Sequence, residues 1–278
     1  EFDTLTSNFT DRNFPTIASS GDWKDPSNYE FDELEIENNL TTDRNIEGAL
    51  NAALPLVVGG MSLEVKAGMK GRQKNKDRDN RMEIYEWDGA GDLTMDNADI
   101  TGDFDNPSFL LDNYPSAAQG FHDDRKFIDF YKDNTSSFTR ADAADEIEDQ
   151  WAGDYDARER VGAGYVQGKI STGMVSVLGG VRGEYTSTEY TAYTVDEGAA
   201  TYRERKGSKT DLQILPMAHL KISPVSDANI RLAYTRSFIR PEFYDLAPYR
   251  FTNDDGDEQE RGNPNLAMAT ADNIDIFR

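Results

Sequence analysis

Several residue types and patterns are scarce in this sequence, and each absence narrows what the chain can be. It contains no cysteine, which excludes disulfides, thiolate metal sites and thiol nucleophiles. Its two histidines, His122 and His219, leave little material for clustered imidazole chemistry. No run approaches the roughly 18 apolar residues that a transmembrane helix needs, which excludes a helical membrane protein. A membrane β-barrel remains possible, because only alternate residues of its strands face lipid and no long apolar run is needed.

Positive charge is also scarce. The chain has 29 Lys and Arg against 52 Asp and Glu, a net charge of -23. Nucleic acid is therefore not expected as a partner, since duplexes are bound mainly by Lys and Arg that neutralise phosphates. The mean hydropathy of -0.72, taken alone, describes a soluble acidic protein. One interpretation is thus a soluble extracellular all-β binding domain with acidic, calcium-binding loops.

The familiar catalytic signatures are missing as well. There is no Gly-x-Ser-x-Gly elbow, no P-loop and no His-Glu-x-x-His motif. We therefore expect no enzyme activity and predict no catalytic, cofactor-binding or metal-ligating residue. Acidic runs offer hard oxygen ligands for Ca²⁺, although neither run has EF-hand spacing. These runs are Asp96, Asp99, Asp103 and Asp105, and Asp254, Asp255, Asp257 and Glu258.

Alternation of apolar and polar residues is the clearest pattern that is present. In Asn229–Ile239 the residues Ile230, Leu232 and Tyr234 alternate with polar ones, which puts the two sets on opposite faces of a β-strand. Arg240-Pro241 ends that strand, because proline cannot donate to a ladder. The same pattern predicts further antiparallel strands at Ser62–Arg72, Arg81–Trp87, Glu159–Ser171, Met174–Thr194 and Thr210–Ser223.

Other stretches favour helices and turns. Thr42–Leu54 has apolar residues at helical spacing and predicts a short helix. Gln73–Asn80 predicts a charged turn between two strands. The long segment Asp88–Ala157 is rich in Asp, Asn, Ser and Gly, and predicts a loop that carries short helices. The helices are expected at Asp123–Asp133 and within Arg140–Trp151.

Two blocks of sequence resemble a known family. The first runs from Arg231 through Arg240-Pro241 to Tyr249 and is followed by Gly262-Asn-Pro-Asn-Leu266. The second joins Asp154-Tyr-Asp-Ala-Arg-Glu159 to Gly179-Gly-Val-Arg-Gly-Glu-Tyr185. Both resemble the TonB-dependent outer-membrane receptors. In that family a barrel strand ends in Arg-Pro, a loop follows, and Gly-Asn-Pro-x-Leu leads into the next strand.

The resemblance implies an all-β fold, an antiparallel up-and-down transmembrane β-barrel with long extracellular loops. Such receptors have roughly 22 strands and a plugged lumen. Residues 1–278 are expected to form a middle portion of roughly eight to ten strands, an open wall without the plug domain. The apolar alternates expected to face lipid are Val175, Val177, Val181, Leu212, Ile214, Ile230 and Leu232.

The resemblance also implies a function. The chain would lie in the bacterial outer membrane and serve active uptake of a scarce nutrient, which would be a glycan, a peptide or an iron complex. Its partners would be outer-membrane lipid, its own plug domain, a TonB-type energising protein, the nutrient ligand and a surface-exposed lipoprotein.

We expect ligand recognition at the loops Asp88–Ala157 and Glu242–Arg261, both on the extracellular end. Their acidity favours a neutral or cation-bridged ligand within a Debye length of about 8 Å. Basic residues of the lumen restore attraction for anions further in; they are Arg182, Lys221 and Arg231. Arg182 and Glu184 share a strand face and can pair there. Four aromatic residues near strand ends are expected to form an interfacial girdle or to stack on sugars: Trp87, Trp151, Tyr155 and Tyr249.

Overall fold

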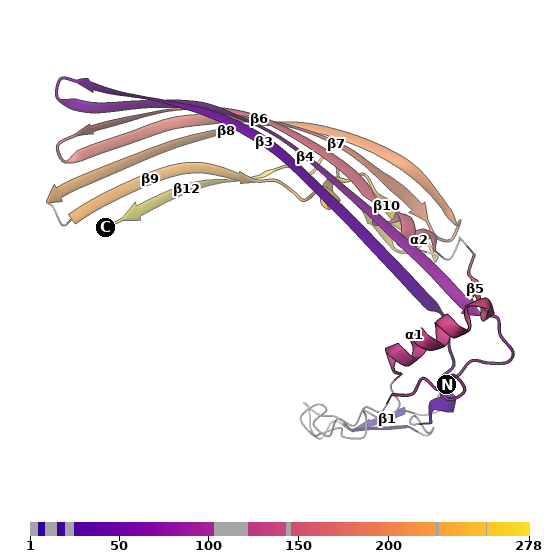
Figure 1. Cartoon of the computed structure of the whole chain (residues 1–278). Helices are drawn as coiled ribbons and strands as arrows, with labels where there is room; N and C mark the ends of the chain where they lie inside the picture. Colours follow the sequence, from indigo (N-terminus) through magenta and orange to yellow (C-terminus); the bar gives the residue numbers. More distant parts are fainter. Residues whose placement is uncertain are drawn as a thin grey trace. The chain divides into compact units, whose positions relative to one another are not determined.

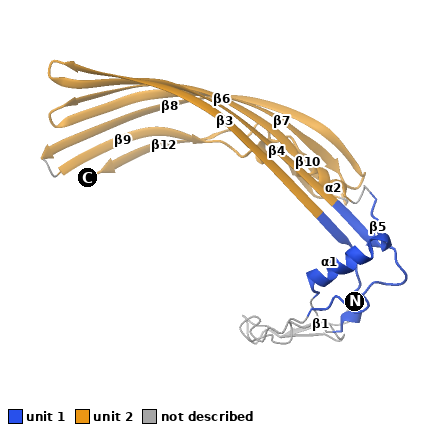
Figure 2. Cartoon of the chain, viewed as in Figure 1, with its two compact units in different colours: residues 1–36, 83–142 blue, residues 37–82, 143–278 orange. Residues whose placement is uncertain are grey.

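The computed structural model of the chain describes most of its length, in two compact units (Figure 2). Unit 1 comprises residues 1–36 and 83–142, and unit 2 comprises residues 37–82 and 143–278. The described residues are 5–8, 16–19, 25–102, 122–142, 146–225, 228–253 and 255–278. Near the N-terminus, β1 (Leu5–Asn8) pairs antiparallel with β2 (Thr16–Ser19).

One large sheet organises the chain (Figure 1). Its strands lie in the order β12-β9-β8-β7-β6-β4-β3, and neighbours along the chain are neighbours in the sheet. Along this path every register from β4 to β12 is antiparallel. The sheet is therefore an up-and-down meander, as predicted. Its strands are β3 (Leu34–Val58), β4 (Met61–Trp87), β6 (Tyr155–Thr172), β7 (Val175–Asp196), β8 (Thr201–Val225), β9 (Ala228–Ile239) and β12 (Ala269–Phe277).

The alternating pattern gives the sheet one apolar and one polar face. Rows of paired residues cross the strands, and on the apolar face one such row contains Ile170, Val177 and Leu220. The seven side chains predicted to point outward are all exposed, from 36% to 64%, and lie on this face. No second layer of the described residues packs against them. The prediction of an uncovered apolar face is confirmed, which contradicts the alternative of a soluble domain with a buried core.

The apolar face forms a band of limited height. On β7 it runs from Val175 to Tyr185, and on β8 from Leu212 to Ile222, with the ends of the two stretches paired. A tilted β-strand needs about 9–11 residues to cross a bilayer, and these stretches match that length. Beyond Tyr185 and Leu212 the same face becomes polar. The strands are thus longer than the band that they carry.

Short turns join the strands at one end of the sheet. β3 and β4 meet at Gly59 and Gly60, whose φ angles of 57° and 79° suit glycine because it lacks a Cβ. β6 and β7 are joined through Gly173, with φ of 47°, at the tight turn after Thr172. The connections after β4, β7 and β9 all leave the sheet at the opposite end. The two long loops therefore emerge at the same end, as predicted.

The predicted helix at Thr42–Leu54 is wrong, because these residues lie inside strand β3. Ile46, Leu50 and Leu54 are spaced by an even number of positions, so they share a face in a strand as well as in a helix. All three are exposed on β3. Hydrogen bonding to β4 selects the strand over the helix. The local sequence of residues 42–54 contains no information about that neighbouring strand.

The predicted turn at Gln73–Asn80 is also wrong. β4 continues through it for 27 residues, and its pairing with β6 extends to Arg78 and Tyr155. The predicted strand Thr210–Ser223 is likewise only part of a longer strand, β8, which begins at Thr201. A charged stretch need not turn where a strand extends beyond the apolar band into water. The change to polar residues marks the end of the apolar band, whereas the strand itself continues.

Unit 1 contains short elements around a small core. Its helix α1 (Asp124–Asp133) is capped by Asp123, whose side chain accepts from the N–H groups of Arg125 and Lys126, so the predicted helix is confirmed. The core consists of Leu93, Ala98, Ile100 and Phe138, with partly buried aromatic rings packed around them. The other elements are η1 (Pro26–Asn28), η2 (Thr135–Ser137) and β5 (Phe138–Arg140), which pairs with the end of β4.

Unit 2 adds a few short elements to the sheet. Helix α2 (Ile147–Trp151) lies within Arg140–Trp151, the range in which a short helix is predicted. After β9 come α3 (Phe243–Leu246), β10 (Arg250–Thr252) and β11 (Gln259–Arg261). β10 pairs with β11 and lies parallel to the end of β7.

The wall is open. Among the described residues β3 and β12 are the two edges of the sheet, and neither pairs with the other. The expected open wall is confirmed. Separately, the described residues include no helix with the length and hydrophobicity required to cross a membrane.

Candidate functional site

The polar face carries a row of basic side chains along β4. Between Lys66 and Arg78 every second residue, apart from Gly68, is Lys or Arg. Alternate residues of a strand point to the same face, so these six cations line up. The row consists of Lys66, Lys70, Arg72, Lys74, Lys76 and Arg78, opposite polar-face residues of β6.

Part of this charge is neutralised by neighbouring carboxylates. Lys70 Nζ lies 2.8 Å from Glu47 of β3, and Lys74 Nζ lies 2.9 Å from Asp43 of the same strand. Within the described residues, Lys76 and Arg78 have no carboxylate at ion-pair distance. The end of the row nearest the long connections therefore keeps excess positive charge.

A buried ion network crosses the polar face beside this row. Arg240, just after β9, contacts Glu159 of β6 at 3.4 Å and also pairs with Glu184 of β7. Arg72 forms a second ion pair with Glu159, and Arg182 lies 2.6 Å from Glu184. The two carboxylates are almost fully buried, so their charges depend on these guanidinium groups. The network fixes the base of the loop that begins at Arg240.

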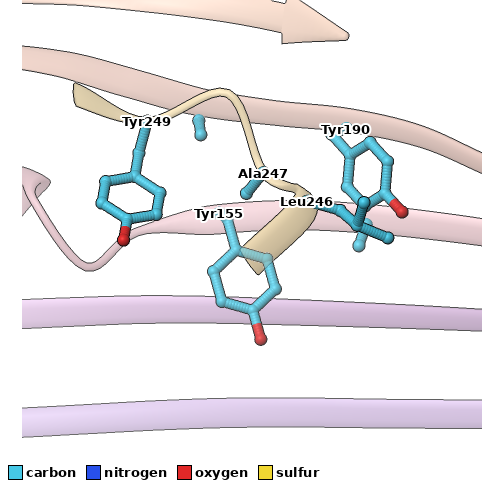
Figure 3. Packing of buried hydrophobic residues seen from close by; sticks show 7 residues of the cluster. Tyr155, Tyr190, Leu246, Ala247 and Tyr249 are labelled. Carbon is cyan, nitrogen blue, oxygen red and sulfur yellow. The ribbon is translucent and has the colours of Figure 1, made fainter. Parts of the chain in front are cut away.

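That loop folds back onto the polar face of the wall (Figure 3). Leu246, Ala247 and Tyr249 are buried against Tyr155 of β6 and Tyr190 of β7. Phe243 and Tyr244 pack against the same cluster. The second long connection is therefore an inward-folded element whose hydrophobic core is shared with the sheet. We call residues 240–266 the inner loop.

Aromatic rings and cations meet beneath the inner loop. Tyr244 and Tyr249 stack with centroids 4.5 Å apart, and Tyr249 Oη donates to Glu260 at 2.6 Å. Burial and the Glu260 carboxylate raise the pKa of the Tyr249 phenol, which stays protonated and donates. Arg78 lies 6.0 Å from the ring centroid of Tyr244, and Lys74 lies 5.4 Å from that of Phe243.

Gly262 is required by the close approach of the inner loop to itself. A Cβ at this position would lie 1.9 Å from the carbonyl oxygen of Ala247. The Gly262 N–H donates to the carbonyl of Tyr249 at 3.1 Å, and the Asn263 N–H donates to that of Asp245 at 2.7 Å. The Gly-Asn-Pro block thus closes the loop by backbone hydrogen bonds that only glycine permits.

Asp154 ties the entry of β6 to the far end of β4. Its carboxylate accepts from the backbone N–H of Asn80 at 2.7 Å, and the residue is 9% exposed. Burial raises the pKa of the Asp154 carboxyl to about 6, although the bond from Asn80 acts in the opposite direction. This carboxyl therefore titrates near pH 6, above the range of an ordinary aspartate.

The acidic runs do not assemble a metal site in the described residues. No three carboxylate or imidazole groups converge there on a common point. Asp103, Asp105 and Asp254 lie outside the described residues, so calcium binding by these two runs stays a prediction.

The structure brings some predicted residues together and separates others. Arg182 pairs with Glu184 as expected from their shared face. Lys221 and Arg231 are direct neighbours across β8 and β9. Tyr155 and Tyr249 do not form an interfacial girdle, because Tyr249 of the inner loop and Tyr155 of β6 are buried in one shared cluster. Trp151 stacks on Tyr202 at 4.1 Å, and Trp87 packs in the core of unit 1.

Three features of the site were missed by sequence reasoning. The second half of the basic row, from Lys74 to Arg78, lies in the predicted turn Gln73–Asn80, although the spacing of its cations at every second position indicates a strand. The Arg240 network and the inward fold of the inner loop had no such sign, because both depend on contacts between strands that are distant in sequence.

Comparison with known proteins gives one family match. A model described as "Outer membrane protein beta-barrel family" matches residues 122–276, which is more than half of the chain. A search of curated proteins found no match. The matched region includes strands β6 to β9, nearly all of β12, and the whole inner loop.

Proposed function

Since this chain belongs to the outer membrane protein beta-barrel family, we propose that it forms part of a TonB-dependent receptor that actively takes up a scarce nutrient. Family membership places the chain in the bacterial outer membrane. The apolar band faces lipid there, and the polar face lines the interior of the barrel. The long connections lie on the extracellular side, because barrels of this kind have short periplasmic turns.

One observation carries the finer assignment. The two sequence blocks that resemble TonB-dependent receptors meet in space at the Arg240 network. Arg240 belongs to the first block, and its partners Glu159 and Glu184 belong to the second. Gly262 of the Gly-Asn-Pro motif closes the same loop onto Tyr249. The family-like residues thus form one structural unit at the mouth of the barrel, which supports a shared architecture over a chance likeness.

The open edges support a larger barrel. In lipid, every backbone N–H and C=O of a spanning strand needs a partner, so β3 and β12 require further strands beside them. We propose that strands outside residues 1–278 close the wall and that a plug domain fills it. An inner-membrane TonB-type protein would supply the energy, and a surface lipoprotein would assist capture.

The inner loop and the basic row form the proposed recognition surface. The aromatic rings of the loop suit sugar or peptide groups, and Lys76 and Arg78 are available to an acidic group of the ligand. A glycan, a peptide or an iron complex each satisfies this combination. The acidic loops beyond it favour ligands that are neutral overall or carry a bound cation.

The test separates an active receptor from a passive pore. The full-length protein in a planar lipid bilayer should show no steady ion conductance, because a plug closes the lumen. Growth on a nutrient that needs this protein should stop when the energising protein is deleted, while binding of that nutrient to cells is retained. A steady open-channel current, or growth without the energising protein, would sink the proposal.

A further inference from the structure

The outward face of the wall changes from apolar to cationic residues just beyond the apolar band. Along β3 it passes from Ile46 to Arg44, because alternate residues share a face. Along β6 it passes from glycines to Arg160 and Arg158. The paired residues Tyr185 and Leu212 mark the upper edge of the band on β7 and β8. The cations therefore begin where the hydrocarbon core ends, on the extracellular side.

A groove of about 640 Å³ lies on this outward face of unit 2. Its central row crosses four strands in register, as Asn75, Arg158, Glu189 and Ser208. Arg44 of β3 and Lys206 of β8 line its two sides. The central row is about 13 Å along the strands beyond the band, or about 9 Å along the membrane normal for a tilt near 45°. That height is the level of lipid headgroups.

The carboxylates of the groove do not neutralise all of its positive charge. Glu189 is shared by Arg158 at 3.9 Å and Arg160 at 3.5 Å, and all three side chains are half exposed. Arg158 Nε also donates to Asn75 at 3.3 Å. Within the described residues, Arg44 has no ion-pair partner. Lys206 contacts Glu204 at 2.8 Å and is largely exposed.

Besides Glu189 of the central row, the groove has two acidic residues, and both lie on the side away from the membrane. Asp77 and Asp156 face each other in the next row beyond Asn75 and Arg158. An anionic group would be repelled from that row and held at the row of Arg158. The hydroxyl of Ser208 and the amide of Asn75 flank this position and suit sugar oxygens.

We propose that this groove binds the phosphate-bearing headgroup of an outer-leaflet lipid, whose acyl chains lie along the apolar band beneath it. Guanidinium groups bind phosphate through paired, charge-assisted hydrogen bonds. The groove is continuous with the lipid-facing surface, which brings headgroups to it at high local concentration. The site is separate from the lumen, so it holds whether or not the chain is an active receptor.

The experiment uses the full-length protein in phosphatidylcholine nanodiscs, with or without diphosphorylated lipid A. Lipid that stays bound after transfer to detergent is measured by native mass spectrometry. The double variant Arg44→Gln with Arg158→Gln should retain about tenfold less lipid A, because both removed cations act at the headgroup level. The control variant Arg81→Gln with Lys169→Gln loses the same charge outside the groove and should retain lipid A like the wild type.

Three results would overturn the proposal. The first is unchanged lipid A retention by the double variant. The second is competition by inorganic phosphate, with equal binding of phosphate to protein in plain phosphatidylcholine nanodiscs, which would assign the groove to free phosphate. Should the double variant fail to insert, Arg44→Gln alone alters an exposed side chain and should still lower retention several-fold. Unchanged retention by that single variant would also overturn the proposal.

Discussion

The two long connections of this chain are built in different ways. The first, after β4, packs within unit 1 around Phe138, in a core completed by the end of β4 and by the N-terminal segment. The ring centroids of Tyr131, Trp87 and Phe31 lie 5.0, 5.3 and 5.6 Å from that of Phe138. The inner loop has no core of its own. It buries Leu246 and Tyr249 against side chains of β6 and β7.

This difference determines how each connection is stabilised. A segment with its own core keeps its structure through local packing, and its loss leaves the wall intact. A segment whose apolar residues are buried against the sheet gains stability only when the sheet is formed. It also covers part of the sheet surface. The first connection can therefore vary independently, whereas the inner loop is coupled to the sheet.

The largest expected effect comes from removing the centre of the core of unit 1. Phe138→Ala should cost about 3–5 kcal/mol, because Phe138 is buried among several aromatic rings. Hydrogen exchange of the full-length protein should show lost protection in α1 and β5 only. Equal loss of protection at residues 243–249 would contradict the independence of the two connections.

The coupling of the inner loop is tested at Arg240. Arg240→Ala should cost about 3–5 kcal/mol, since it leaves Glu159 and Glu184 buried with one guanidinium fewer each. Limited proteolysis should then cut within residues 250–261. The matched control Arg236→Ala removes an exposed arginine 3.8 Å from Asp272 and should cost at most about 1 kcal/mol. Equal sensitivity of the two variants would refute the role given to the network.

A smaller effect is expected from crowding the loop. Gly262→Ala forces a Cβ against the Ala247 carbonyl and should cost about 1–3 kcal/mol. Gly71→Ala serves as the control, because a Cβ there would meet nothing within 4 Å. The measurement is again the rate of cleavage within the inner loop. If both glycine variants behave alike, close packing of the loop is not what holds it down.

The smallest effect is a pH dependence at Asp154. The pKa of its carboxyl is raised from 3.8 to about 6, so the folded state binds the proton more tightly than the unfolded chain. Stability at this contact should be highest below about pH 4, fall as the pH rises towards 6, and level off above it. Asp154→Asn should remove this dependence. Dividing the proteolysis rate of the variant by that of the wild type at each pH removes the pH dependence of the protease itself. A ratio that does not change with pH would disprove the assignment.

Alternation predicted the main elements of the wall because its cause is local. Val175, Val177 and Val181 face one way through the geometry of an extended chain, whatever lies beside them. The same reasoning failed at Thr42–Leu54, where an even spacing satisfies both a helix and a strand. It failed again at Gln73–Asn80, because local polarity does not distinguish a turn from a strand that has left the membrane.

The site was predicted only where its residues are neighbours in the strand. Arg182 and Glu184 share a face two positions apart, so their pairing could be expected. The contact of Arg240 with Glu184 joins residues separated by 56 positions, and no local pattern encodes it. The burial of Tyr155 and Tyr249 also depends on how the inner loop returns to the wall, which is set by tertiary packing.

The position of Arg240 has a consequence for the order of assembly. Its two carboxylate partners come from different strands, Glu159 on β6 and Glu184 on β7. Neither the ionic anchor nor the pocket for Leu246 exists until these strands have paired. Docking of the inner loop is thus a late, non-local step that follows wall formation, since closing such long chain segments is favourable only after the partner surface is in place. Protection of residues 243–249 would then serve as a kinetic marker of a correctly inserted wall.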